Sequence, residues 1–286
     1  MNFFSIAQCL QLSPELDAIS DSARLDIELI LCHVLQKNRT YLFTWPDKVL
    51  SIEQAETFQI FFNRRKSGEP IAHILGQREF WSLPLSVNNS TLIPRPDTEL
   101  VVELVLELFV DDAPQQKRGC LDLGTGTGAI VLAIASEKPD WQLVGVDKSA
   151  DAVALAEQNR DQLHFSHVQI KQSDWFSAIP AQQFDVIVSN PPYIDPQDPH
   201  LAQGDVRFEP RSALIADNHG LADIELIIQQ GWNYLREQGW LLLEHGYDQG
   251  QSVRDLFYAR GFTQVETRRD LDGNERVSLG RKGTAS

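Results

Sequence analysis

The pattern of hydrophobic positions changes its period part of the way along this chain. Up to about residue 74, apolar residues recur at three- and four-residue spacing, which predicts short amphipathic helices. The two clearest helix faces are formed by Leu25, Glu28, Leu29, Cys32 and His33 and by Ala55, Phe58, Phe61 and Phe62. We therefore expect residues 1–75 to form a domain of three to five helices packed as a small bundle.

The next segment has an alternating pattern instead. Residues 79–93 alternate between apolar and polar positions, and Asn88-Asn89-Ser90 interrupts them. Alternation around turn-forming residues predicts a β-hairpin, which we place in a linker over residues 76–95. Residues 97–110 then form a strongly amphipathic helix, which Asp97 or Thr98 can cap.

From residue 119 onward, short apolar runs typical of strands alternate with helical segments. This alternation predicts a parallel sheet with helices on both faces. The last two predicted strands are joined only by residues 271–274, so the final strand should run antiparallel. We predict an α/β fold in which residues 96–286 form a Rossmann-like sheet with an antiparallel last strand.

Composition narrows the classes of protein that this chain can belong to. With 286 residues, 42% of them hydrophobic, it is long enough to bury a substantial core. Its net charge of −15 opposes binding to a phosphate backbone and favours a protein partner over nucleic acid. No apolar run approaches the roughly 18 residues of a membrane span. The widely spaced Cys9, Cys32 and Cys120 match no zinc pattern. We expect a cytoplasmic monomer without a metal site.

A glycine-rich loop, residues 124–128, follows a predicted strand and opens a helix. Glycine lets the backbone approach a ligand closely and adopt positive φ. Asp147 ends the next strand, 19 residues after Gly128, where a carboxylate can hold both ribose hydroxyls of a nucleoside. Dinucleotide-binding folds use Gly-x-Gly-x-x-Gly, whereas the spacing here resembles the first motif of class I methyltransferases. The candidate cofactor contacts are Asp122, Gly124, Thr125, Gly126, Gly128 and Asp147.

Asp174 and Trp175 follow the third predicted strand of this sheet. The ligand crevice of an open α/β sheet lies at such strand ends. In a methyltransferase, Asp174 would accept a hydrogen bond from the adenine amino group and Trp175 would stack on the ring. The alternative is a loop acid beside a core tryptophan.

The most specific motif is Asn190-Pro191-Pro192-Tyr193, which ends a predicted strand. Consecutive prolines stop the strand and stiffen the backbone, which presents the Asn190 amide and the Pro191 carbonyl as fixed acceptors. A planar NH₂ group has two protons for two such acceptors, and Tyr193 supplies an aromatic wall. Orienting the delocalised lone pair of an amide nitrogen in this way can contribute roughly 7–11 kcal/mol. Asn190 would also border the cofactor.

The chain closely resembles the PrmC/HemK family of N5-glutamine methyltransferases. The resemblance rests on residues 93–99 (IPRPDTE), LDLGTGTGAI, SDWF, NPPYI and residues 208–214 (FEPRSAL), and it covers essentially the whole chain. It implies S-adenosylmethionine as the cofactor and the Gly-Gly-Gln motif of class-1 peptide chain release factors as the substrate. Asn190, Pro191, Pro192 and Tyr193 would hold the target glutamine. The N-terminal bundle would help to bind the release factor, and residues 208–214 would edge the substrate cleft.

Three other functions remain open on the sequence alone. The same motif serves enzymes that methylate adenine in DNA or bases in ribosomal RNA, although this chain is acidic and lacks a basic, aromatic-rich domain for gripping a base. A non-catalytic methyltransferase fold is disfavoured by the intact Asn190, Pro191 and Asp147. A dehydrogenase is disfavoured by the glycine spacing.

Overall fold

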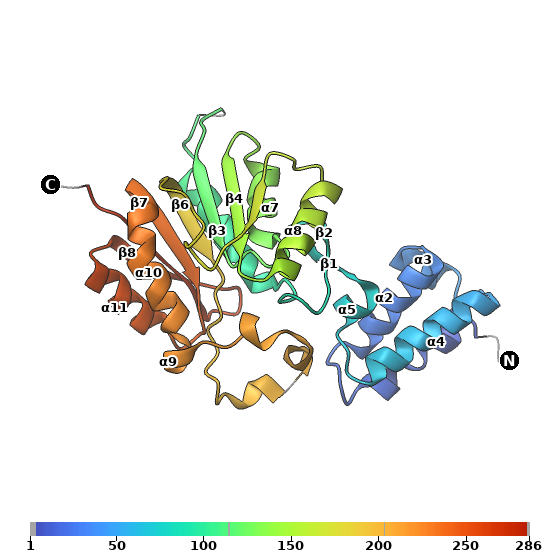
Figure 1. Cartoon of the computed structure of the whole chain (residues 1–286). Coiled ribbons are helices and arrows are strands. Elements are labelled where there is room, and N and C mark those ends of the chain that lie inside the picture. Colours follow the sequence, from blue (N-terminus) through green and yellow to red (C-terminus); the bar gives the residue numbers. More distant parts are fainter. Residues whose placement is uncertain (1–3, 114, 203, 285–286) are drawn as a thin grey trace. The chain divides into compact units, whose positions relative to one another are not determined.

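The chain divides into two compact units. The computed structural model describes residues 4–113, 115–202 and 204–284. One unit contains the residues up to Gln77 together with Pro199–Phe208, and the other contains Arg78–Asp198 and the residues from Glu209 onward. Figure 1 shows that the first unit is helical and that the second is built on a sheet with helices on both faces.

The helical unit confirms the expected N-terminal bundle. Ser5 and Ser51 begin the first and fourth helices with capping boxes, in which the serine and a glutamine three residues later bond reciprocally. Phe58 and Phe62 are buried in its core, as their spacing predicts. Its elements are α1 (Ile6–Leu10), η1 (Ser13–Leu16), α2 (Ala23–Leu35), α3 (Arg39–Thr44), α4 (Ile52–Lys66), α5 (Ile71–Leu75), η3 (Pro199–Ala202) and η4 (Gly204–Phe208).

The buried face of α2 differs from the predicted one. Leu25 is 39% exposed, whereas Ile27, on the opposite side of the helix, is fully buried. Two acids lie on the buried side. Glu28 belongs to the predicted face and is paired with arginines nearer the surface, whereas Asp26, which the prediction left out, is paired with the buried Arg65 at 2.7 Å. Because a paired acid can be buried at tolerable cost, a charged residue does not always mark the solvent face of a helix.

The hairpin is present, but its turn is not where the sequence placed it. Strands β1 (Gln77–Phe80) and β2 (Leu83–Ser86) are joined by Trp81 and Ser82, which both adopt positive φ. Tight hairpin turns require positive φ at both central residues, which asparagine and glycine normally supply, so these residues give no turn signal. The predicted break at Asn88–Ser90 is a local turn after the hairpin, where Ser90 N–H donates to Asn88 Oδ1.

The large unit holds a seven-stranded sheet in the order β5-β4-β3-β6-β7-β9-β8. Strands β3 to β7 run parallel and β9 runs antiparallel to both of its neighbours, which confirms the predicted fold class. Its elements are β3 (Gly119–Leu123), β4 (Gln142–Asp147), β5 (Gln169–Gln172), β6 (Phe184–Ser189), β7 (Leu235–Glu244), β8 (Thr263–Arg269), β9 (Glu275–Arg281), η2 (Pro96–Thr98), α6 (Glu99–Leu108), α7 (Ala129–Glu137), α8 (Ala150–Gln162), η5 (Arg211–Ala213), α9 (Asp217–Gly220), α10 (Ala222–Tyr234) and α11 (Gly250–Arg260).

Two hydrophobic cores cover the two faces of this sheet. Helices α6, α7 and α8 pack on one face together with the hairpin, and α10 and α11 pack on the other (Figure 1). The chain builds β3, β4 and β5 toward one edge and then returns to add β6 on the other side of β3. In open α/β sheets a ligand crevice forms at this reversal, beyond the carboxyl ends of the strands. The ends of β3, β4 and β6 are therefore where a site is expected.

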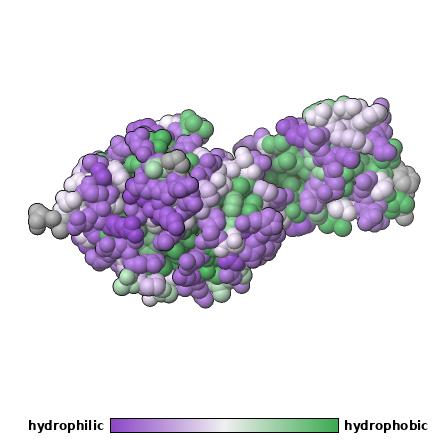
Figure 2. Space-filling view, turned by 90° about the horizontal axis from the view of Figure 1, so that it is seen from above, coloured by the Kyte–Doolittle hydropathy of each residue, from purple (hydrophilic) through white to green (hydrophobic). Residues whose placement is uncertain are grey.

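The surface is mostly hydrophilic in the view of Figure 2, with hydrophobic side chains reaching it in several places. Scattered exposed apolar residues are normal on soluble domains. Among the described residues, no helix is both long enough and apolar enough to cross a bilayer.

Candidate functional site

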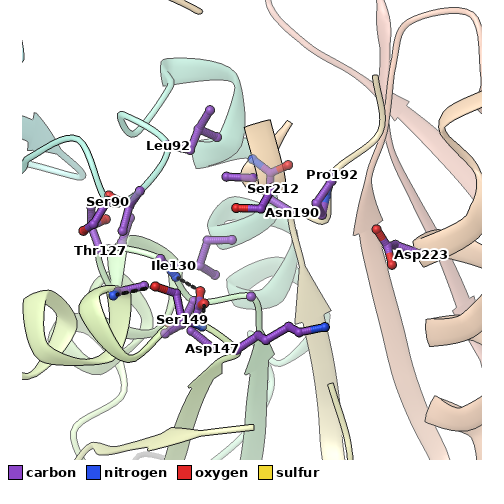
Figure 3. Close-up of a pocket in the computed structure, with 18 of the residues that line it drawn as sticks. Ser90, Leu92, Thr127, Ile130, Asp147, Ser149, Asn190, Pro192, Ser212 and Asp223 are labelled. Carbon is purple, nitrogen blue, oxygen red and sulfur yellow. Dashed lines mark hydrogen bonds between the residues drawn. The ribbon is translucent and has the colours of Figure 1, made fainter. Parts of the chain in front are cut away.

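A pocket of about 460 Å³ opens beyond the carboxyl ends of β3, β4 and β6. This volume falls in the usual range of small-molecule sites. Asp147 and Asn190 lie at the ends of different strands, and Figure 3 shows that both border the same pocket. Of the candidate residues predicted from sequence, those that line it are Gly124, Thr125, Gly126, Asp147, Asp174, Trp175, Asn190 and Pro192.

The glycine loop takes the conformation that the motif predicts. Gly124, Gly126 and Gly128 all have positive φ, which side chains rarely tolerate. A Cβ on Gly128 would also lie 2.9 Å from Leu132 Cδ1, so this glycine permits the close start of α7. Gly128 does not line the pocket, and its role is to shape the loop.

Asp122 lies beneath the loop and does not reach the pocket. Its side chain is fully buried and accepts a hydrogen bond from Thr125 Oγ1 at 2.6 Å. Burial raises the pKa of this carboxyl to about 7. The structure thus gives Asp122 the geometry of a support for Thr125, because full burial removes it from direct contact with a ligand.

Asp147 is held by the backbone on both oxygens of its carboxylate. Oδ2 accepts Gly126 N–H at 3.0 Å, and Oδ1 accepts Ser149 N–H at 2.9 Å. Partial burial raises the pKa of Asp147, and these backbone bonds oppose that rise. Each oxygen has a further lone pair for a ligand, so the carboxylate is fixed in place and still able to accept hydroxyl protons.

Trp175 and Asp174 border the pocket after β5, and they differ in how firmly they are held. The Trp175 ring lies where a Cβ on Gly124 would meet it at 3.5 Å, and its indole N–H donates to Asp223. Asp174 is about half exposed and pairs with Lys148 at 2.8 Å. Trp175 is therefore a rigid wall, whereas Asp174 is a solvated acid at the pocket rim.

The Asn-Pro-Pro-Tyr segment leaves β6 at the edge of the pocket. Asn190 Nδ2 donates to Thr98 Oγ1 at 3.1 Å, while Asn190 and Pro192 line the pocket. Pro191 and Tyr193 do not line it, and the Tyr193 hydroxyl donates to Glu244 Oε1 at 3.3 Å. Burial raises the pKa of Tyr193 further above its usual value, so it stays protonated.

Two segments named by the sequence meet at the rim of the pocket. Arg95 pairs with Glu209, whose side chain is completely buried. This pair joins residues 93–99 to the loop of residues 209–214, and both segments belong to the large unit. Ser212 and Ala213 of that loop line the pocket, as Figure 3 shows for Ser212.

Sequence analysis missed two acids and gave a third residue no role. Glu244 ends β7 beside β6, so its position at a strand end was the same signal that singled out Asp147. Asp223 lies in the first turn of α10, where acids are common for helix-dipole reasons, so no signal distinguishes it. Thr98 was expected in a segment near the site and as a possible helix cap, with no individual role in the site, and its side chain makes no capping hydrogen bond.

Within the described part of the chain, no group of three or more His, Cys, Asp or Glu side chains is arranged to hold a metal ion. The arrangement of the pocket can hold a ribose on Asp147 and an aromatic ring against Trp175. It also places the Asn190 side-chain amide, bonded through Nδ2 to Thr98, in the lining of the same pocket.

Comparison with known proteins gives two family matches and many close relatives. Residues 11–76 match the PrmC N-terminal domain and residues 101–206 match the methyltransferase small domain. A release factor glutamine methyltransferase of Shewanella oneidensis is 52% identical over 277 residues, covering 96% of each chain. The release factor glutamine methyltransferase of Escherichia coli K12 is 54% identical over 262 residues, covering 92% of this chain and 93% of that one.

Solved structures share the fold at low sequence identity. A methyltransferase from Pyrococcus furiosus aligns with a TM-score of 0.53 at 16% identity, covering 80% of this chain and 99% of that one. At this identity the likeness concerns the fold.

Proposed function

This chain belongs to the release factor glutamine methyltransferase family, and from that premise we propose its substrate and cofactor. It transfers a methyl group from S-adenosylmethionine to the N5 side-chain nitrogen of the glutamine in the Gly-Gly-Gln motif of class-1 peptide chain release factors. The observation that carries the proposal is the position of Asn190 at the end of β6, bordering the same pocket as Asp147.

The pocket fits S-adenosylmethionine on the chemistry of its lining. The carboxylate of Asp147 can accept both ribose hydroxyls, and Trp175 offers a flat apolar face for adenine. Gly124, Thr125 and Gly126 leave room for an amino-acid tail along the loop, because the two glycines carry no side chain. Asp174 at the rim would accept from the adenine amino group. When bound, the cofactor supplies an electrophilic methyl group on a sulfonium.

Residues of this chain would then prepare the nitrogen that attacks. Asn190 Oδ1 and the Pro191 carbonyl each accept one proton of the glutamine NH₂ group. When both protons are held, the plane of the NH₂ group is fixed, and the nitrogen lone pair, which is perpendicular to that plane, would face the cofactor side of the pocket. Fixed dipoles also stabilise positive charge as it develops on nitrogen. As the N–C bond forms and the S–C bond breaks, one amide proton leaves to water. Pro192, which lines the pocket, would provide the wall of the substrate position, and Tyr193, anchored to Glu244, would support this segment from outside the lining.

The helical unit would recognise the body of the release factor, and the protein would work as a monomer in the cytoplasm. The three cysteines are free thiols, as expected in a reducing compartment. The net charge of −15 suits a basic protein surface better than a nucleic acid.

The deciding experiment is mass spectrometry of a purified class-1 release factor after incubation with this protein and S-adenosylmethionine. A gain of one methyl group on the Gly-Gly-Gln glutamine is expected, and Asn190→Ala should abolish most of it. Parallel reactions on duplex DNA and ribosomal RNA test the competing substrates. Methylation of either nucleic acid, with none of the release factor, would overturn the proposal.

A further inference from the structure

We propose that Thr98 and Glu244 are positioning residues that fix which end of the Asn190 side-chain amide faces the substrate. The inference rests on the proposed function, because it assigns a cause to the orientation of the acceptor that this function needs. Neither residue touches the reacting atoms in this scheme, since both act through Asn190.

The three residues come from separate parts of the large unit; Thr98 and Asn190 line the pocket, and Glu244 lies outside its lining. Asn190 Nδ2 donates to Thr98 Oγ1 at 3.1 Å. The Thr98 hydroxyl also lies beside the Glu244 carboxylate, whose pKa it lowers. Thr98 and Glu244 are 4% and 1% exposed, so water does not compete for these bonds. We call this set the amide relay.

The direction of each hydrogen bond in the amide relay follows from Glu244, its last member. An ionised carboxylate only accepts hydrogen bonds, so the single hydroxyl proton of Thr98 is directed to Glu244. Oε2 of that carboxylate is buried and has no hydrogen-bond partner among the described residues, so it is the acceptor that the proposal assigns to the Thr98 proton. Thr98 Oγ1 can then only accept, and the Asn190 group that donates to it must be the NH₂ end.

The amide relay therefore decides where the oxygen end of the Asn190 side-chain amide lies. With Nδ2 bound to Thr98, Oδ1 is the end that no described residue occupies. An asparagine turned by 180° would present two N–H protons to a substrate that also brings two protons, and the pair would repel. Since the two ends of an amide are nearly equal in shape, packing cannot choose between them, whereas hydrogen-bond polarity can.

Stability alone does not account for this arrangement. Thr98 is the N-cap of α6, yet its oxygen accepts no helix N–H, so the cap contribution of about 1 kcal/mol is not realised. Glu244 is buried at the end of a central strand, where its charged form is disfavoured by desolvation. The Tyr193 hydroxyl also donates to it, which ties the same acid to the other end of the substrate-binding segment.

The test uses Thr98→Val, which keeps the shape of threonine and removes the hydroxyl, and Thr98→Ser, which keeps the hydroxyl. At pH 8 we expect kcat for the release factor to fall roughly 10- to 100-fold in Thr98→Val, as when an aligned group is slightly misplaced. KM, cofactor affinity and melting temperature should stay close to wild type. Thr98→Ser should recover most of the lost turnover, and Thr263→Val on the exposed part of β8 serves as the matched control. Wild-type kcat in Thr98→Val would overturn the proposal.

A double variant separates action through Asn190 from an independent role. If Thr98 acts only by orienting Asn190, Thr98→Val combined with Asn190→Ala should be no slower than Asn190→Ala alone. A further loss of the full Thr98→Val factor would overturn the amide relay.

A second readout does not depend on turnover. Exchange of the Asn190 side-chain NH₂ protons, assigned by comparison with Asn190→Ala, should be slow in wild type and in Thr98→Ser but fast in Thr98→Val. Equal exchange in wild type and Thr98→Val would overturn the relay. An inactive wild type with the expected exchange pattern would instead support the relay and contradict the proposed function.

Discussion

Asp147 Oδ2 accepts the backbone N–H of Gly126 at 3.0 Å, although the two residues are 21 positions apart in the chain. This bond ties the glycine loop after β3 to the end of β4. The carboxylate proposed to bind the ribose therefore also sets the shape of the loop proposed to bind the rest of the cofactor.

Replacing Asp147 with alanine should mainly weaken cofactor binding. One hydrogen bond to a charged group contributes about 1.5–3 kcal/mol, so the loss of even one ribose hydroxyl contact should raise the Kd for S-adenosylmethionine at least roughly 10- to 150-fold. Isothermal titration calorimetry measures this change directly. Asp140→Ala, at an exposed position after α7, is the control and should bind normally. Unchanged affinity in Asp147→Ala would remove this residue from the ribose site.

Replacing Asn190 with alanine should separate binding from turnover. The variant should fold and bind cofactor normally, and its kcat should fall roughly 10²- to 10³-fold, as when one fixed polar group is removed from a preorganised site. Single-turnover methylation of the release factor checks this. Asn233→Ala on the exposed side of α10 should behave as wild type. Near-normal kcat in Asn190→Ala would exclude Asn190 as the positioning acceptor.

Glu244 should make stability depend on pH. Burial raises the pKa of its carboxyl from 4.5 to about 7, although Thr98, Arg276 and Tyr193 favour the charged form and Asp97 opposes it. Between these pH values the folded protein binds more protons than the unfolded chain, so its unfolding free energy falls as pH rises from about 4.5 to about 7.

Urea unfolding of wild type and Glu244→Gln across this range measures the effect. Wild type should lose more unfolding free energy than the variant as pH rises. The comparison isolates Glu244, because Asp122 titrates in the same direction in both proteins. Parallel stability curves would show that Glu244 does not titrate in this range.

The helical unit offers a contrast between two neighbouring cations. Arg65 is buried and pairs with the buried Asp26 at 2.7 Å, so Arg65→Ala leaves an uncompensated charge and should cost about 3–5 kcal/mol of unfolding free energy. Lys66 pairs with Glu15 in solvent, and Lys66→Ala should cost at most about 1 kcal/mol. Equal effects in urea unfolding would contradict this account of the buried pair.

Local signals were sufficient for much of the fold. Alternating strands and helices predicted the parallel sheet, and the short link over residues 271–274 predicted its antiparallel last strand. Positive φ in the glycine loop followed from residue type alone. The failures occurred where the tertiary structure overrides local preference, as at the buried Asp26 of α2 and in the turn at Trp81 and Ser82.

The sequence by itself determined the chemistry of the site, because strand ends, a glycine spacing and a double proline fix which backbone and side-chain groups reach the crevice. Only the tertiary structure decided which of those groups face a ligand and which support another residue. Asp122 and Asp147 look alike as site candidates in the sequence, yet the first is wholly buried beneath the glycine loop and the second lines the pocket. Burial and long-range hydrogen bonding depend on what other segments bring alongside, and no local pattern carries that information.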